Sequence, residues 1–377
     1  MRCCASTLVK IRQIDERNLL TLKKLTLTIA LSAMLLAACV PQVAAPSTTP
    51  TPAAPAVLRV MTHDSFLVSE ALVAQFEQEN NVKLSFLPSG DTGAALNKAI
   101  LSKGAPLADV FYGVDNTFLS RALDESLFEP YASPLLANIP AEFKLDTDNR
   151  ALPVDYGDVC INYDKAYFAE KNLALPQSLE DLTAPAYKGL LAIENPATSS
   201  PGLAFLLATI AHFGEDGYLA YWQQLKDNGL VVVNDWNTAY YTNFSGSSGR
   251  GPQPMVVSYA SSPPAEVIFA ETPLTDAPTA SIIAPGTCFR QIEFVGILAD
   301  TPQRALAEAF VDFMLSIPFQ EDMPLQMFVY PVQPDAKLPE AFVSYAQVPL
   351  QPATLDPATI SANRTVWIEA WTETVLR

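Results

Sequence analysis

The sequence is short of histidine and of basic residues. Its 377 residues include only two histidines, and 23 Lys and Arg are outnumbered by 40 Asp and Glu, which gives a formal net charge of −17. A nucleic-acid groove needs clustered cations to neutralise phosphates, and no basic stripe occurs past the N-terminus. Two histidines also make a histidine-rich metal site or a Ser-His hydrolase hard to build. We therefore expect no nucleic-acid partner and no metal site.

The sequence also lacks the common motifs of enzymes. It contains no P-loop, no Gly-x-Gly-x-x-Gly, no Gly-x-Ser-x-Gly and no His-Glu-x-x-His pattern. His212 ends an apolar run with helical spacing, where a structural role near the C-terminal end of a helix is expected. The sequence therefore predicts no catalytic residue, no cofactor and no enzymatic activity.

The first 38 residues have the pattern of a signal peptide. Basic residues precede an apolar stretch at 25–38, which has the length of a signal h-region and is short for a bilayer span. This stretch ends in Leu36-Ala37-Ala38-Cys39, which resembles a bacterial lipobox. We predict a lipoprotein signal peptide at 1–38 and lipidation of Cys39. An ordinary secretory signal and an uncleaved anchor are the alternatives.

Residues 39–56 are dominated by Pro, Ala and Thr, which cannot pack a core. Such a composition predicts a semi-extended tether between Cys39 and an acidic globular part. The order of signal, cysteine, tether and globule predicts an extracytoplasmic protein, lipid-anchored to the cell membrane in the periplasm or at the cell surface.

Cysteine usage fits that compartment. Cys3 and Cys4 lie in the predicted signal peptide and Cys39 is the predicted lipidation site, so only Cys160 and Cys288 remain in the folded part. Two cysteines in an exported protein favour a disulfide. Two separately buried thiols are the alternative.

The chain from Val57 onward alternates strand and helix patterns. Apolar runs at 57–61, 82–86 and 108–112 predict strands, while 66–79 and the segment containing Leu96 and Ile100 have helical spacing. This order predicts a parallel, doubly wound α/β sheet. Ligands in such sheets bind where strands end and turns open into helices. Two such turns are His63-Asp64-Ser65 and Gly90-Asp91-Thr92-Gly93.

A second α/β set follows, and together the two sets predict two lobes with a cleft between them. Its strands and helices are predicted at 155–163, 190–194, 203–213, 230–233, 255–259, 289–298 and 302–315. The turn Ser199-Ser200-Pro201-Gly202 opens into the first of these helices. The N–H groups at that helix N-terminus favour an anion such as phosphate.

Aromatic residues gather in turn-like contexts. Trp236 follows a predicted strand, Tyr240 and Tyr241 come soon after, Tyr259 ends another strand, and Phe328 and Tyr330 precede Pro331. Rings at strand ends beside small polar residues suit stacking on a planar or cationic ligand. Taken singly, each is more often a partly buried structural residue, and together they predict an aromatic-lined cleft.

Eight short segments, in this order over about 300 residues, resemble the substrate-binding lipoproteins and periplasmic proteins of bacterial ABC importers, specifically the thiamine-binding branch. These segments are 63–66, 90–93, 108–116, 153–157, 196–202, 236–240, 258–263 and 327–332. The resemblance implies an α/β, type II two-lobed fold in which each lobe is a mixed sheet flanked by helices. Asp155–Tyr163 and Phe289–Leu298 would be the two crossover strands that form the hinge, and a Cys160–Cys288 bridge would lie in or beside them.

The resemblance also implies lobe boundaries and partners. Lobe 1 would comprise 57–154 plus 292–330, and lobe 2 would comprise 155–291 plus 331–377. The protein would close on thiamine or a thiamine phosphate and deliver it to an ABC permease in the membrane, and we expect it to be a monomer.

Roles carry over by position from this family. Asp91 would be a polar or charge partner, and Ser199 and Ser200 would donate hydrogen bonds, including to a phosphate. Trp236 and Tyr259 would be aromatic walls, with Tyr240 nearby.

Two positions depart from the family pattern. His63 stands where tyrosine is typical, and Phe328 stands where tryptophan is typical. These two differences leave a ligand related to thiamine as an alternative. Alternative ligands are a polyamine and ferric iron, the latter held by Tyr240 and Tyr241 as phenolates. A lipid-anchored hydrolase is a more distant alternative, since no nucleophile–base pair supports it.

Overall fold

The computed structural model describes residues 55–248 and 250–377, and Pro55–Arg377 form one compact unit. The predicted signal peptide, Cys39 and most of the predicted tether lie outside the described residues. Within the described part, no helix has the length and apolar character needed to span a bilayer.

The N-terminal strands form a parallel sheet, as predicted. The strands β1 (Ala56–Thr62), β2 (Val82–Pro88) and β3 (Val110–Asp115) lie in the order β2-β1-β3, with β1 parallel to both neighbours. The helices α2 (Glu70–Asn80) and α3 (Thr92–Leu101) connect them. The first helix therefore begins later than its apolar spacing from Phe66 predicted. Residues 63–69 form an irregular loop instead.

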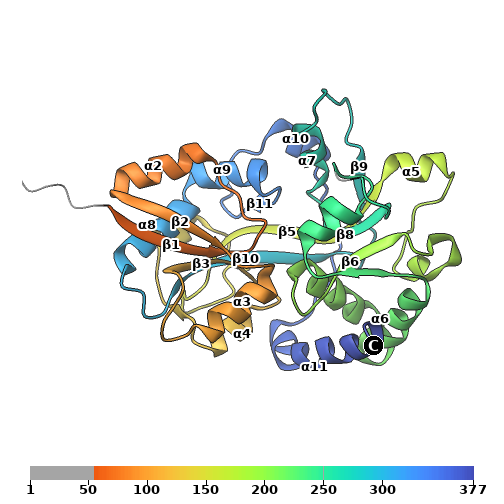
Figure 1. Cartoon of the computed structure of the whole chain (residues 1–377), viewed down its shortest axis with the longest axis horizontal. Helices are drawn as coiled ribbons and strands as arrows, with labels where there is room; N and C mark the ends of the chain where they lie inside the picture. Colours follow the sequence, from red (N-terminus) through yellow and green to blue (C-terminus); the bar gives the residue numbers. More distant parts are fainter. Residues whose placement is uncertain (1–54, 249) are drawn as a thin grey trace, which may run out of the picture. The chain divides into compact units, whose positions relative to one another are not determined.

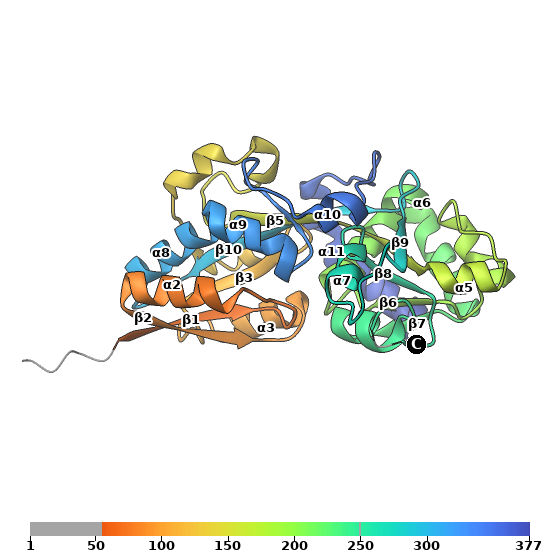
Figure 2. The same ribbon diagram turned by 90° about the horizontal axis from the view of Figure 1, so that it is seen from above.

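Two long strands run between the lobes (Figures 1 and 2). They are β5 (Leu152–Asp164) and β10 (Phe289–Leu298), which are antiparallel to each other. One part of β10 pairs with β3, and the far end of β5 pairs with β8 and β9. The predicted crossover strands are therefore confirmed. Arg290 fastens them together through two hydrogen bonds to Asp158, of 3.0 and 2.9 Å.

The second lobe is built on four strands of mixed direction. These are β6 (Leu191–Glu194), β7 (Val231–Val233), β8 (Met255–Tyr259) and β9 (Thr279–Ile282). The strand β6 is parallel to β7 and β8, whereas β8 and β9 are antiparallel to β5. Through β5 and β10, the two lobes share one sheet in the order β2-β1-β3-β10-β5-β8-β6-β7. We use "first lobe" for the part around β1–β3 and "second lobe" for the part around β6–β9. The residue limits of the lobes stay a prediction.

Helix α6 (Ser200–Asp227) is much longer than the predicted helix at 203–213. Its path breaks at Gly214, where φ is 72° and ψ is 173°. This left-handed φ costs glycine little because it has no Cβ. The predicted helix therefore corresponds to the segment before the break. Near that break, the His212 Nε2–H donates a 2.7 Å hydrogen bond to the Glu180 carboxylate.

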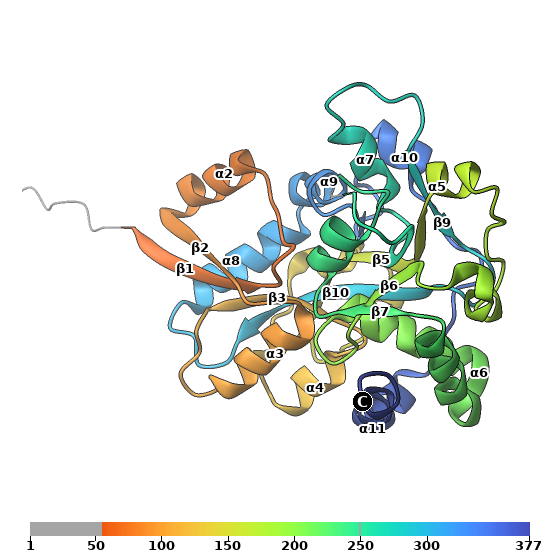
Figure 3. The same cartoon turned by 45° about the vertical axis from the view of Figure 1, so that its right-hand side comes forward.

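The remaining elements cover the sheet and the hinge. They are α4 (Leu119–Asp124), β4 (Phe128–Glu129), α5 (Lys165–Glu170), α7 (Pro263–Ile268), α8 (Arg304–Leu315), α9 (Ile317–Gln326), β11 (Tyr330–Pro331), α10 (Glu340–Tyr345) and α11 (Pro357–Val375), with 3₁₀ turns at Pro134–Asn138, Ala141–Phe143, Glu180–Thr183 and Pro185–Tyr187 and a π-helical turn at Thr238–Asn243. Figure 3 shows α7 beside α10, and α11 below α6.

The C-terminal helix α11 contacts both lobes. Trp371 packs edge-on against Trp222 of α6, with ring centroids 5.5 Å apart, and both side chains are fully buried. Arg364 reaches the first lobe, where it donates a 3.1 Å hydrogen bond to Ser120 and lies over the Phe118 ring. By contacting α6 in the second lobe and Ser120 in the first lobe, this helix stabilises the arrangement of the two lobes.

A disulfide joins Cys160 to Cys288. Cys160 lies in β5, and Cys288 directly precedes β10. The bond therefore ties the two crossover strands together where they enter the second lobe.

Candidate functional site

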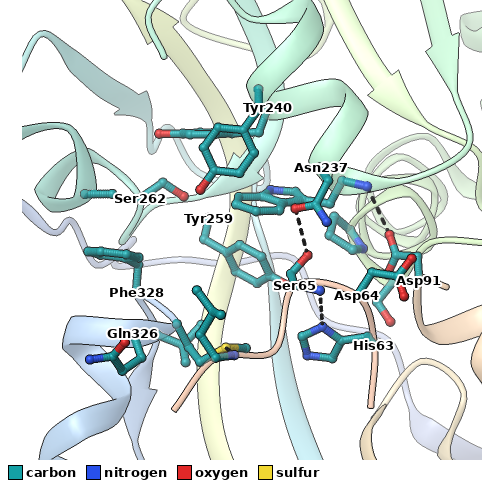
Figure 4. Close-up of a pocket in the computed structure, with 18 of the residues that line it drawn as sticks. His63, Asp64, Ser65, Asp91, Asn237, Tyr240, Tyr259, Ser262, Gln326 and Phe328 are labelled. Atoms are coloured by element: carbon teal, nitrogen blue, oxygen red, sulfur yellow. Dashed lines mark hydrogen bonds between the residues drawn. The ribbon is translucent and has the colours of Figure 1, made fainter. Parts of the chain in front are cut away.

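A cavity of about 170 Å³ lies between the lobes, where loops that follow strands of both lobes converge (Figure 4). The first lobe contributes the turn after β1, the start of α3 and the segment after α9, and the second lobe contributes the start of α6, the segment after β7 and the end of β8. The lining residues are His63, Asp64, Ser65, Leu67, Asp91, Thr92, Ser200, Pro201, Trp236, Asn237, Tyr240, Tyr241, Tyr259, Ser262, Ala265, Phe269, Glu293, Gln326, Met327, Phe328 and Val329.

A stacked pair of rings forms one wall of this cavity. Trp236 follows β7, and the π-helical turn Thr238–Asn243 brings Tyr240 beneath it, with ring centroids 4.9 Å apart and planes 17° apart. The indole N–H donates to the Ser258 hydroxyl over 2.9 Å. Because both the stacking and the hydrogen bond fix the indole, its free face is held ready for a planar ligand.

Tyr259 lies at the end of β8 and packs on the hinge. A Cβ at Gly157 of β5 would come within 2.7 Å of the Tyr259 ring, so only glycine leaves room there. Burial raises the pKa of the Tyr259 hydroxyl well above its usual value, and the carboxyls of Glu293 and Asp91 add to the rise. The ring therefore stays a neutral phenol against the crossover strand.

Phe328 lines the cavity on the side away from Asp91 (Figure 4). Its backbone has φ of 55°, a left-handed conformation that is unfavourable for an aromatic residue. The ring meets Phe269 edge-on, with centroids 5.5 Å apart. Backbone strain at a bulky residue is a feature that clusters at ligand-binding sites.

Asp91 links the two lobes. Its side chain caps α3 by accepting from the Thr92 N–H over 2.8 Å, and it also accepts from the Trp236 N–H of the second lobe over 3.1 Å. Burial raises the pKa of Asp91 to about 6, although the hydrogen bonds from the Thr92 and Trp236 N–H groups and the nearby Ser199 hydroxyl act in the opposite direction. One carboxyl thus joins the first-lobe helix to the aromatic wall.

Further hydrogen bonds cross between the lobes at the cavity. The Ser65 hydroxyl donates to Asn237 over 3.2 Å, and the Gly93 N–H donates to the Thr198 carbonyl over 3.0 Å. A Cβ at Gly93 would meet the Ala197 carbonyl at 2.7 Å, so the backbones approach closely there. The lobes are therefore in contact around the cavity, as in a closed binding protein.

Ser199 and Ser200 occupy different positions although they are adjacent. Ser200 lines the cavity and donates to Asp115 at the end of β3, a further contact between lobes. Ser199 precedes α6, is fully buried and does not line the cavity, and its hydroxyl lies close enough to Asp91 to lower the pKa of that carboxyl.

His63 is buried at the cavity floor. Its Nδ1 accepts a 3.2 Å hydrogen bond from the Ser65 N–H, which leaves the proton of the neutral ring on Nε2. Burial lowers the pKa of His63 to about 4, so the ring is neutral at pH 7. A Cβ at Gly113 would meet the imidazole at 2.5 Å, and Gly113 has a φ of 108°. The ring packs directly on strand β3.

The charged side chains that line the cavity are all acidic in the described chain. Asp64, Asp91 and Glu293 line the cavity, and no Lys or Arg is among the lining residues of the described chain. The same described residues hold no group of three or more His, Cys, Asp or Glu side chains arranged for a metal ion. The arrangement suits an organic cation with flat rings.

A two-lobed sheet with two crossover strands and a cavity between the lobes defines a solute-binding protein. Residues 105–350 match the family of bacterial extracellular solute-binding proteins, and the chain belongs to that family. It is 32% identical to the thiamine-binding periplasmic protein of Salmonella typhimurium over 85% of this chain and 94% of that protein. It is 30% identical to the protein of the same name from Brucella suis, over 83% and 90%. A solved periplasmic thiamin binding protein superposes with a TM-score of 0.75 at 28% identity, covering 85% of this chain and 96% of that one.

The structure brings most of the predicted site residues together. The cavity is lined by seven of the eight, namely His63, Asp91, Ser200, Trp236, Tyr240, Tyr259 and Phe328. Their binding roles stay a prediction.

Sequence reasoning overlooked Glu293, which lines the cavity from inside a crossover strand. The available signal was a lone acidic residue within the apolar run Ile292 to Leu298. Phe269 was also overlooked, because it follows a short helix rather than a strand.

Proposed function

We propose that this protein is the solute-binding component of an ABC importer that captures thiamine in the cavity between its lobes. The observation that carries the proposal is a wall of aromatic rings combined with acidic groups and no Lys or Arg in the lining. Family membership and the thiamine-binding relatives support it. Such a protein works outside the cytoplasm, closes on its ligand as a monomer and delivers it to a membrane permease. Lipidation of Cys39 would hold it at the membrane.

Thiamine matches the chemistry of this lining. It joins a cationic thiazolium to a flat aminopyrimidine, and the faces of Trp236, Tyr259 and Phe328 attract both. A cation over an aromatic face gains about 0.5–2 kcal/mol per contact. The carboxyls of Asp64 and Asp91 add attraction from the first lobe.

A phosphate on the ligand would meet a different part of the site. Ser200 and the N-terminus of α6 are its natural donors, with Ser199 behind them. Two carboxyls lie close to these donors: Asp115 accepts from the Ser200 hydroxyl, and Asp91 lies near the Ser199 hydroxyl. Either carboxyl repels an anion when it is ionised. We therefore propose that free thiamine binds more tightly than thiamine diphosphate.

Ferric iron is a weaker proposal. Tyr240 is fully buried beneath Trp236, and burial followed by the Glu266 carboxyl raises the pKa of its hydroxyl well above the usual value. Burial also raises the pKa of Tyr241. Forming two phenolates at this position is therefore costly.

Titration calorimetry tests the thiamine proposal. We expect one-to-one binding of thiamine with micromolar or tighter affinity, weaker binding of thiamine diphosphate, and no phenolate–iron colour when ferric citrate is added. Trp236→Ala is expected to weaken thiamine binding about 3- to 30-fold, which is the value of one cation–aromatic contact.

Two control variants make the result interpretable. Trp236→Phe keeps a ring but removes the hydrogen bond to Ser258, and its affinity should stay within about threefold of the wild type. Tyr167→Ala removes an aromatic residue that does not line the cavity and should leave binding unchanged. Absence of thiamine binding by the folded wild-type protein would refute the proposal.

A further inference from the structure

Three carboxyls lie side by side on the central strands. Glu293 of β10 is directly opposite Asp115 of β3 on one side and Asp155 of β5 on the other. Each of the three is at least nine-tenths buried, and Glu293 lines the cavity. Like charges directly opposite one another destabilise a sheet, so all three cannot be ionised without a compensating cation. None of the Lys or Arg side chains forms an ion pair with any of the three in the described residues.

The hydrogen bonds of Tyr112 indicate where a proton resides. Its hydroxyl lies 2.6 Å from the Asp155 Oδ2 and 2.9 Å from the Glu293 Oε2. A hydroxyl has one hydrogen, so it donates to one carboxyl and must accept from the other. A carboxyl donates only when it is protonated. Both contacts of Tyr112 are satisfied together when the pair formed by Asp155 and Glu293 holds one proton.

The surroundings assign that proton to Glu293. Burial raises the pKa of Glu293 well above its usual value, and the neighbouring carboxyls of Asp155 and Asp115 raise it further. Burial raises the pKa of Asp155 to about 6. The shorter contact from Tyr112 is the one to Asp155, as expected when the hydroxyl donates to an ionised carboxylate.

His63 supplies an independent observation at the same place. Its Nε2, which carries the proton of the neutral ring, has no hydrogen-bond partner among residues 55–248 and 250–377 although the side chain is buried. That nitrogen lies 3.7 Å from the Glu293 Oε1, and both residues border the cavity. A buried donor without a partner is costly unless a ligand or a neighbouring group satisfies it. An ionised Glu293 would be a stronger acceptor for this N–H than the neutral acid.

The other groups that face Glu293 are neutral or already satisfied. On its own strand, the Gln291 amide lies 3.3 Å from the Oε1. From β3, Asp115 accepts from Ser200 and from the Thr117 N–H. From β8, Tyr259 is a neutral phenol, because burial raises its pKa well above the usual value. No positive charge from these elements stabilises an ionised Glu293 in the empty cavity.

We propose that Glu293 is a proton-exchange group, which is a neutral acid in the empty cavity and loses its proton to solvent when a cationic ligand enters. The ligand then provides the missing positive charge, and His63 Nε2–H gains a carboxylate acceptor. One cation enters and one proton leaves, so charge is conserved in the cavity. This inference rests on the proposed capture of thiamine and adds that its binding is coupled to proton release.

Calorimetry of the full chain in detergent tests this coupling. Thiamine is titrated at pH 7 in buffers of different ionisation enthalpy, and the dependence of the heat on the buffer counts the protons released. We expect the wild type to release about one proton per thiamine, and its affinity to rise with pH by up to about tenfold per unit in the range where Glu293 is protonated. The neutral aminopyrimidine fragment without the thiazolium should release none.

Glu293→Gln is the decisive variant, because an amide mimics the neutral acid and donates to Tyr112 in its place. We expect it to bind thiamine about tenfold more weakly at pH 8 and to release no proton. Glu180→Gln makes the same substitution at a position that does not line the cavity and should behave as the wild type. Thiamine binding with no proton release, with flat pH dependence, or with equal release by Glu293→Gln would overturn this inference alone. Absence of thiamine binding by the wild type would overturn the proposed function, and this inference with it.

Discussion

Removing the Cys160–Cys288 disulfide is expected to lower stability while leaving ligand affinity nearly unchanged. The bond joins β5 to the residue before β10, and neither sulfur borders the cavity. Cys160 pairs with Ser258 of β8, so the bond lies within the second lobe rather than across the cavity. The double variant Cys160→Ala/Cys288→Ala removes it with little change of packing.

The size of the effect follows from the loop that the bond closes. The cysteines are 128 residues apart, and in the chain-entropy account a loop of this length constrains the unfolded chain by about 5 kcal/mol. The compact unit from Pro55 to Arg377 has an unfolding entropy of about 0.7 kcal/mol per kelvin, from the usual value per residue. The expected decrease in Tm is therefore about 7 °C.

Thermal unfolding of the wild type and the double variant measures this difference, and thiamine titration checks the cavity. Affinity should stay within about threefold, since the lining is untouched. Protein from Val57 onward contains only these two cysteines, so thiol titration of the denatured, unreduced protein should find no free thiol. Two free thiols, or equal Tm values for the two proteins, would refute the reasoning.

Three shorter predictions concern the cavity. Gly157→Ala places a methyl group 2.7 Å from the Tyr259 ring and should displace that ring. Thiamine affinity measured by calorimetry should therefore fall at least tenfold. An unchanged affinity would contradict the packing argument. Phe328→Trp enlarges the aromatic face, and we expect thiamine to bind a few-fold more tightly in the same assay; weaker binding would contradict it. The pKa of Asp91 is raised to about 6 in the folded protein, so the contribution of this carboxyl to stability should fall as pH rises from about 4 to 6. Over this range the Tm should decrease more in the wild type than in Asp91→Asn. Parallel curves of Tm against pH would contradict the assignment.

Strand periodicity and turn composition predicted much of the fold. The runs Asp155–Tyr163 and Phe289–Leu298 have the length and the apolar content of strands although both include charged residues, and they form β5 and β10. Most of the site residues occupy turns at strand ends, which converge at one edge of the sheet, and the resemblance to the thiamine-binding branch assigned their roles. Trp236 and Tyr259 illustrate this, since each follows or ends a strand of the second lobe.

Interactions between distant side chains could not be predicted in this way. The contacts of the Tyr112 hydroxyl with Asp155 and Glu293 depend on the register of three strands, and register shifts at 293–295 alter the simple alternation. The burial of Ser199 depends on how α6 begins rather than on its residue type. The loop at 63–69 replaced the first predicted turn of α2, where the Ser69 N–H donates to Asp322 of α9. The spacing of apolar residues between 66 and 79 carries no information on a distant hydrogen-bond partner such as Asp322.

The contacts that hold the two lobes together around the cavity are hydrogen bonds. Four hydrogen bonds described above join the lobes: Trp236 N–H to Asp91, Ser65 to Asn237, Gly93 N–H to the Thr198 carbonyl, and Ser200 to Asp115. Around the cavity no ion pair joins the first lobe to the second in the described residues. Each hydrogen bond contributes about 1 kcal/mol net, because water replaces it on opening. The empty protein can therefore open at low cost, whereas a cation held between the rings and Glu293 adds attraction that exists only when the lobes are closed.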